Sequence, residues 1–192
     1  MLASVTISAC ATDIPAQTIE QRYSSPASQF LQLSDGVRLH VRDEGRRDAP
    51  VIILAHGSNA SLHTWEKWVS VLKPNWRVIS FDFPAHGLTG PSASGIYNGE
   101  TYVRVVDEMA TKLGVERFVL AGNSMGGAVA WRYALAHPDR LAGLVLLNSA
   151  GYPRDTEGPS AVWCFAWRVP PSLVRPFPDL PIAASWKRNS KM

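Results

Sequence analysis

The hydrophobic and polar positions of the chain follow two different patterns. From residue 37 to residue 42, apolar side chains alternate with charged or polar ones, and a short apolar stretch precedes Asp35-Gly36. A two-residue period is typical of strands with one buried face, and Asp-Gly favours a two-residue hairpin turn. The pattern predicts a half-buried β-hairpin over residues 29–45, with Arg38, His40 and Arg42 on its polar face.

From residue 50 onward, continuous apolar runs alternate with segments of helical spacing. The runs predict strands that are covered on both faces, and the segments between them predict amphipathic helices. The predicted strands are 50–56, 76–82, 117–122 and 141–149, and the predicted helices are 61–73, 100–114 and 126–138. This alternation predicts an α/β fold with a mostly parallel sheet and helices on both faces.

The ends of the predicted strands carry the polar and small residues of this region. Ligands of parallel sheets bind beyond the carboxyl ends of the strands. We therefore expect four strand ends to converge in space: residues 55–57, Asp82, residues 122–124 and residues 148–149.

Both ends of the chain lack this regularity. We expect residues 1–27 to form an N-terminal tail, irregular over residues 11–27, and residues 28–150 to form the α/β core. Residues 151–192, which hold seven of the chain's 14 prolines, predict an irregular tail.

The segment Ile7-Ser8-Ala9-Cys10 resembles a bacterial lipobox. A secretory signal needs a positively charged start and a longer apolar stretch, and the six residues before Ile7 contain no Lys or Arg. Two interpretations remain open: a lipid anchor at Cys10, which places the chain in the cell envelope, or a disordered tail of a cytoplasmic protein.

The composition narrows the possible partners. The 192 residues are 46% hydrophobic and 18% charged, which fits one globular domain. The net charge of +3 comes from scattered basic residues, so we expect no nucleic-acid partner.

No apolar run of the sequence reaches 18 residues, which predicts no membrane-spanning helix. The two cysteines make no disulfide framework or zinc motif, and we expect no metal or organic cofactor.

The stretch "LAGNSMGGAVA" at residues 120–130 carries the candidate chemistry. Gly122-x-Ser124-x-Gly126 lies between a predicted strand and a predicted helix, the context of a nucleophile elbow. The glycines leave room for a sharp turn, and the helix N-terminus favours negative charge that develops nearby. The alternative is a glycine-rich turn with an ordinary serine.

Together with three further segments, this stretch resembles the α/β-hydrolase family over residues 28–153. The segments are "LAHGSNAS" (54–61), "FDFPAHGLTGP" (81–91) and "LAHPDRLAGLVLLNSAGYP" (135–153). The resemblance implies hydrolysis of a small-molecule substrate with Ser124 as nucleophile. It also implies an oxyanion hole formed by the amide of Met125 and that of Ser58 or Asn59, in a pocket bordered by His56, Gly57, His86 and Asn123.

Three functions remain open. We favour hydrolysis of small carboxylic esters or related acyl bonds. The sequence "GNSMGG" is also similar to hydrolases that cleave C–C bonds in ring-fission products, although their oxyanion loop is usually richer in glycine than "HGSNAS". A non-catalytic small-molecule binding fragment is the third possibility. The serine at position 124 argues against the mechanism of relatives that use an aspartate nucleophile.

The base and the acid of a triad are missing from their usual places. The family order is Ser, then Asp or Glu, then His, and the one histidine after Ser124 is His137. A helix of 13 residues puts it ~20 Å away, whereas a base must come within about 3 Å. His86 is the one plausible substitute base.

A family position for the acid, just after the strand at 141–149, holds Asn148 or Ser149, and neither can carry the required charge. The downstream carboxylates Asp155, Glu157 and Asp179 lie in irregular sequence. We therefore expect a truncated hydrolase, incomplete on the C-terminal side of its sheet and weakly active or inactive. Its open sheet edge would permit self-association. The resemblance also implies that residues 151–192 contain part of a cap region before the irregular tail.

Overall fold

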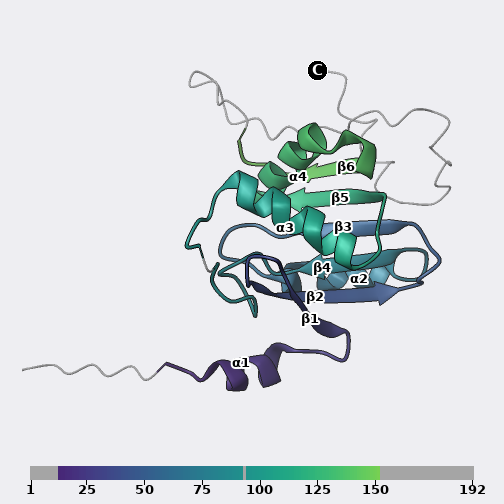
Figure 1. Ribbon diagram of the computed structural model, residues 1–192. Helices are drawn as coiled ribbons and strands as arrows, with labels where there is room; N and C mark the ends of the chain where they lie inside the picture. Colours follow the sequence, from purple (N-terminus) through teal and green to yellow (C-terminus); the bar gives the residue numbers. More distant parts are fainter. Residues whose placement is uncertain (1–12, 93, 152–192) are drawn as a thin grey trace, which may run out of the picture.

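The computed structural model describes residues 13–92 and 94–151 and contains one six-stranded sheet (Figure 1). The strands are β1 (Ser28–Gln32), β2 (Arg38–Gly45), β3 (Val51–Ala55), β4 (Arg77–Phe81), β5 (Phe118–Asn123) and β6 (Leu141–Leu147). Their order is β1-β2-β4-β3-β5-β6. Strands β4, β3, β5 and β6 are parallel, and the hairpin β1–β2 adds two antiparallel strands beside β4. The predicted α/β fold is confirmed.

The described residues form the helices α1 (Ala16–Tyr23), α2 (Glu66–Leu72), α3 (Gly99–Lys112) and α4 (Met125–Ala136). The last three cover the two faces of the sheet. Short 3-10 segments at Leu62–Trp65 and Pro138–Arg140 lead into α2 and β6. Figure 1 shows α3 and α4 in front of the sheet and α2 behind it.

The apolar run of β3 is explained by its two buried faces. Ile53 packs in a cluster that includes Met109 of α3 and Val129 of α4. Its neighbours Ile52 and Leu54 belong to the other cluster, which packs under α2. Because successive side chains of a strand point to opposite faces, a strand covered on both sides must be apolar at every position.

The prediction of an irregular segment over residues 11–27 is wrong, because Ala16–Tyr23 forms α1. This helix buries none of its residues, so it has no apolar stripe for the sequence pattern to reveal. Polar contacts hold it to the hairpin. Arg38 donates two hydrogen bonds to the carboxylate of Glu20, at 2.9 and 3.0 Å, and Arg42 Nη2 donates to the carbonyl of Tyr23 at 3.0 Å.

The hairpin is present, but two details differ from the prediction. The turn is formed by residues 33–36, with the Gly36 amide donating to the Leu33 carbonyl at 3.0 Å, and Gly36 has a left-handed φ of 86°. Its central residues are thus 34 and 35, not Asp35-Gly36. Moreover, the polar face of β2 is only partly exposed, because Arg38 is exposed whereas His40 is fully buried and Arg42 is 7% exposed. His40 contacts Ser28 and Asp82, and Arg42 donates to the Tyr23 carbonyl and to Glu66.

Strand β6 forms one edge of the sheet. It pairs with β5, and no strand of the described ranges pairs with its outer side. All seven residues of β6 are partly exposed, in contrast to the central strands. None of the helices in residues 13–92 and 94–151 has the length and apolar character needed to cross a bilayer.

The carboxylate of Asp43 joins β2 to β4 and provides a test of the fold. Its side chain is fully buried and accepts hydrogen bonds from Arg47 and from Nε and Nη2 of Arg77, the last two at 3.1 and 2.8 Å. We expect Asp43→Ala to lower the free energy of unfolding by about 3–5 kcal/mol, because Arg77, 11% exposed, loses its counter-ion.

Asp48 provides the matched control, since its pair with Arg46 is exposed on both sides (62% and 72%). Asp48→Ala should change stability by less than about 1 kcal/mol in the same urea titration. Equal effects of the two substitutions would contradict the role of Asp43.

Candidate active site

Ser124 occupies a strained turn between β5 and α4. Its φ of 52° and ψ of −113° lie in a region that non-glycine residues rarely adopt. Three backbone hydrogen bonds hold this conformation. The Ser124 amide donates to the Leu147 carbonyl at 2.9 Å, and its carbonyl accepts from the amides of Ala128 and Ala150, both at 3.0 Å. A sharp strand-to-helix turn of this kind projects the hydroxyl of its central residue.

The two glycines of the motif are required by close backbone contacts. A Cβ atom at Gly126 would lie 2.2 Å from the carbonyl oxygen of Ala55 in β3. A Cβ atom at Gly122 would lie 2.3 Å from the carbonyl oxygen of Gly126. The first turn of α4 therefore packs directly on the ends of β3 and β5, which fixes where Ser124 stands.

The loop after β3 lies against Ser124. A Cβ atom at Gly57 would be 3.3 Å from Cβ of Ser124, so these two residues are in contact. Ser58 and Asn59 follow directly and are exposed, with Asn59 at a φ of 53°. Met125 is the first residue of α4, and a first-turn amide has no partner within its own helix. The structure thus brings together the segments proposed to form the oxyanion hole.

His56 braces this loop as a neutral imidazole. Its ring is fully buried, and Nε2 lies 3.0 Å from the amide nitrogen of Phe83. An amide can only donate, so Nε2 must be the acceptor and Nδ1 carries the proton, which it donates to the carbonyl of Gly57 at 2.7 Å. Burial lowers the pKa of His56 below its ordinary value of 6.5, outweighing the hydrogen bond to Gly57 and the charge of Asp82.

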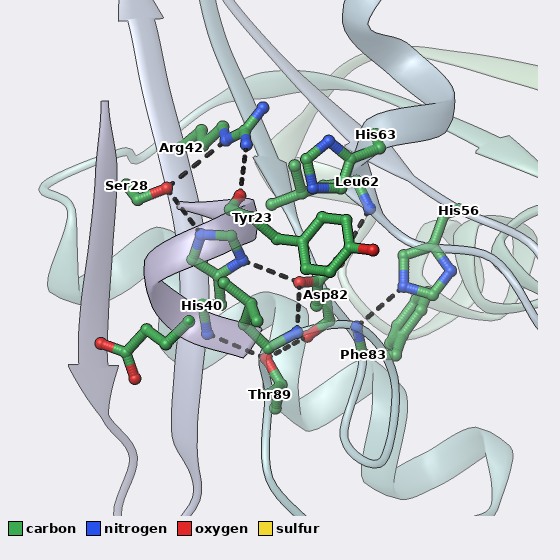
Figure 2. Close-up of polar contacts among 12 residues, drawn as sticks. Tyr23, Ser28, His40, Arg42, His56, Leu62, His63, Asp82, Phe83 and Thr89 are labelled. Atoms are coloured by element: carbon green, nitrogen blue, oxygen red, sulfur yellow. Dashed lines mark hydrogen bonds and ion pairs between the residues drawn. The ribbon is translucent and has the colours of Figure 1, made fainter. Parts of the chain in front are cut away.

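Asp82 links three segments at the end of β4, as Figure 2 shows. Its Oδ1 accepts from the Leu62 amide at 2.7 Å, and its Oδ2 accepts from the Leu88 amide at 2.9 Å and contacts His40 Nδ1 at 2.7 Å. Burial raises the pKa of Asp82, but these three hydrogen bonds outweigh burial and leave the pKa below its ordinary value.

The histidines considered as bases have hydrogen-bond or ring partners other than Ser124. His86 Nδ1 lies 3.0 Å from the carbonyl of Pro84, and its ring packs 5.2 Å from that of His56. His137 ends the unbroken helix α4, where its ring packs on Tyr133. Within residues 13–92 and 94–151, no histidine forms a hydrogen bond with Ser124 Oγ.

The segment after β6 folds back over the elbow. Asn148 has a φ of 45°, and Ser149 Oγ donates to the Ala150 carbonyl at 3.1 Å. The predicted acid position therefore holds the neutral side chains of Asn148 and Ser149, and the Ser149 hydroxyl is bonded to a neighbouring carbonyl. The carboxylates Asp155, Glu157 and Asp179, together with Cys10 and Cys164, lie outside the described residues.

Other candidate sites are separate from Ser124. A groove of about 740 Å³ runs between α3 and α4, with Val103, Arg104, Asp107, Arg132 and His137 among its lining residues. Neither Ser124 nor any residue of the 56–59 loop lines it. No group of three His, Cys, Asp or Glu side chains among the described residues is placed to hold a metal ion.

A strained serine at the carboxyl end of a central parallel strand defines a hydrolase-type α/β protein. The chain belongs to the α/β-hydrolase family, since the family model described as "alpha/beta hydrolase fold" matches residues 50–177.

Individual relatives agree with this assignment. The 2-hydroxymuconate semialdehyde hydrolase of Pseudomonas sp. strain CF600 is 35% identical over 135 residues, which are 68% of this chain and 47% of that protein. A crystal structure of a Pseudomonas aeruginosa hydrolase has a TM-score of 0.64 and 30% identity, covering 69% of this chain and 49% of the other. The crystal structure of the enol-lactonase from Burkholderia xenovorans has a TM-score of 0.60 and 30% identity, covering 64% of this chain and 47% of the other. The chain thus spans about half the length of these relatives.

The contact at Gly126 leads to a test of the elbow. We expect Gly126→Ala to lower the free energy of unfolding by at least about 2 kcal/mol, because the new methyl group would overlap backbone that cannot rotate away. Gly90 is the control, since nothing lies within 4 Å of its Cβ position. Gly90→Ala should stay within about 0.5 kcal/mol, and a similar loss for both variants in chemical denaturation would contradict the packing.

The neutral state of His56 predicts a dependence of stability on pH. Because its folded pKa lies below 6.5, its contribution is complete above pH 6.5 and is lost as the pH falls through the folded pKa. In His56→Gln, a carboxamide oxygen can accept from the Phe83 amide without titrating.

We therefore expect the unfolding free energy of His56→Gln to fall less steeply than that of the original chain as the pH is lowered below 6.5, in denaturant titrations at each pH. Parallel curves would show that His56 is not held neutral.

Proposed function

We propose that Ser124 is the nucleophile of a hydrolase that acts at the carbonyl carbon of small carboxylic esters or related acyl bonds. The observation that supports this is the strained backbone of Ser124 (φ 52°), held where the 56–59 loop meets the first turn of α4. Strain of this kind costs about 1–3 kcal/mol and persists where the surroundings over-determine it.

In the proposed reaction, Ser124 Oγ forms a bond to the carbonyl carbon while the carbonyl π electrons move to oxygen. The amides of Met125 and of Ser58 or Asn59 would donate to that oxyanion. Each such donor is worth ~10²–10³ in rate. The helix N-terminus adds a favourable potential. Collapse of the tetrahedral species breaks the C–O bond to the leaving group, which departs as the alcohol with the proton released from Ser124 Oγ. Water then cleaves the acyl–Ser124 bond, which gives the acid and restores the serine hydroxyl.

The proton of Ser124 Oγ needs an acceptor. Removing the serine or histidine of a serine-protease triad lowers kcat by about 10⁶. Since no imidazole of the described residues contacts Oγ, we expect this chain by itself to react slowly.

A second candidate is the cleavage of a C–C bond next to a carbonyl group. It is favoured by the 35% identity to a protein named 2-hydroxymuconate semialdehyde hydrolase. Ester hydrolysis is supported by the 30% identity to a protein named enol-lactonase, since a lactone is a cyclic ester. Both reactions begin at a carbonyl carbon, so the same strained serine fits either.

A fluorophosphonate probe tests the nucleophile. We expect slow covalent labelling, with the added mass on the peptide that contains Ser124, and no labelling of Ser124→Ala. Ser149→Ala is the matched control, because Ser149 also lies near the elbow, outside the proposed oxyanion loop, and its hydroxyl donates to a backbone carbonyl. Labelling that survives Ser124→Ala, or a folded chain in which Ser124 never reacts, would contradict the proposal. Rapid labelling would show that a base reaches Ser124.

A further inference from the structure

We propose that His40, in the N-terminal hairpin, is a positioning residue for the loop that faces Ser124 and acts through the carboxylate of Asp82. This inference rests on the proposed function, because it concerns the loop that would supply an oxyanion donor. The argument has three parts: how the loop is held, what holds Asp82, and why the contact needs an imidazole.

The loop between His56 and Leu62 is held at both ends by two consecutive residues. At its start, His56 Nε2 accepts from the amide of Phe83 at 3.0 Å. At its end, the Leu62 amide donates to Asp82 Oδ1 at 2.7 Å. Ser58 and Asn59 lie between these two points. The position of their amides relative to Ser124 therefore depends on the orientation of the Asp82 side chain.

Three donors fix that orientation. Leu62 occupies Oδ1, while Leu88 and His40 share Oδ2. Gly87, at a φ of 51°, packs against the carboxylate, since a Cβ there would lie 2.2 Å from Oδ2. The Leu62 and Leu88 donors are backbone amides, whereas the His40 donor is a side chain, and His40 lies in β2 of the N-terminal hairpin. Without it, the buried carboxylate would lose a third of its hydrogen bonds.

The imidazole of His40 is itself oriented from the opposite side. Its Nε2 lies 2.8 Å from Ser28 Oγ in β1 (Figure 2). Ser28 Oγ already accepts from the Ser25 amide at 3.0 Å and from Arg42 Nε at 3.5 Å. Its own proton is therefore directed to Nε2, which leaves the imidazole proton on Nδ1, facing Asp82.

Backbone contacts reinforce this alignment. Thr89 Oγ1 accepts from the His40 amide and donates to the Asp82 carbonyl, both at 2.8 Å. The ring of His40 stacks on Phe30 with centroids 5.1 Å apart. A hydrogen-bonded chain thus runs from the edge strand β1, through Ser28, His40 and Asp82, to the loop beside Ser124.

Two substitutions of His40 separate positioning from simple packing. In His40→Asn, the side-chain amide nitrogen can take the place of Nδ1 and still donate to Asp82. In His40→Gln, the amide group reaches the position of Nε2 and leaves Asp82 without this donor. The measurement is native-state hydrogen exchange of the full chain, followed on peptides that cover residues 56–62 and 83–89.

We expect His40→Gln to speed exchange in these two segments by at least about tenfold, because a buried carboxylate loses a donor. His40→Asn should restore rates close to those of the original chain. Asp43→Ala is the stability control, since it weakens the sheet without contacting the loop. Equal effects of Asn and Gln, or the same exchange pattern in Asp43→Ala, would overturn the proposal.

NMR of the unsubstituted chain gives a test that does not require a variant to fold. The resonances of the two ring nitrogens of His40 report which nitrogen carries the proton. We expect the proton on Nδ1, and its absence there would overturn the proposal.

Fluorophosphonate labelling of Ser124 distinguishes this inference from the proposed function. Slower labelling in His40→Gln with recovery in His40→Asn supports both. Unreactive Ser124 combined with the expected exchange pattern would remove the function and leave the positioning role.

Discussion

The first turn of α4 packs on the backbone of β3 and β5 with no side chain between them, and this contact organises the rest of the site. Gly122 and Gly126 make it possible, because a methyl group at either position would overlap a carbonyl oxygen. The contact places the end of β5 beside the loop after β3, so that Ser124 meets Gly57. It also directs the positive end of a 12-residue helix at the same point. The proposed chemistry at Ser124 thus depends on an absence of side chains two positions away on each side.

The surrounding loops are positioned by buried polar groups rather than by apolar packing. His56 and Asp82 accept hydrogen bonds from backbone amides of the loops that follow β3 and β4. Buried polar groups of this kind are favourable when all of their hydrogen bonds are made and costly when one is lost. The loop beside Ser124 therefore has a defined place without being part of the sheet, and the hairpin β1–β2 contributes to it through His40.

Much of the fold could be predicted from the sequence, because continuous apolar runs and helical spacing are direct consequences of burial on one or both faces. The sharp turn at Ser124 could also be predicted, because glycines at positions 122 and 126 are required where backbones pack closely. The burial of His40 could not be predicted, because its partners Ser28 and Asp82 are 12 and 42 residues away along the chain. Helix α1 was not predicted because it buries none of its residues, so no apolar stripe marks it in the sequence. Asp82 was expected at the convergence of strand ends, but its three hydrogen bonds depend on tertiary structure.

The left-handed backbone at Ser124 links stability to selection. Glycine would adopt this conformation without strain. If Ser124 is the nucleophile, a descendant of this chain that no longer needed it would gain stability by replacing serine with glycine, which has no Cβ. Neutral drift at this position would favour glycine, and only retained chemistry would oppose it. The identity of residue 124 among close variants of the chain would then record whether catalysis is still under selection.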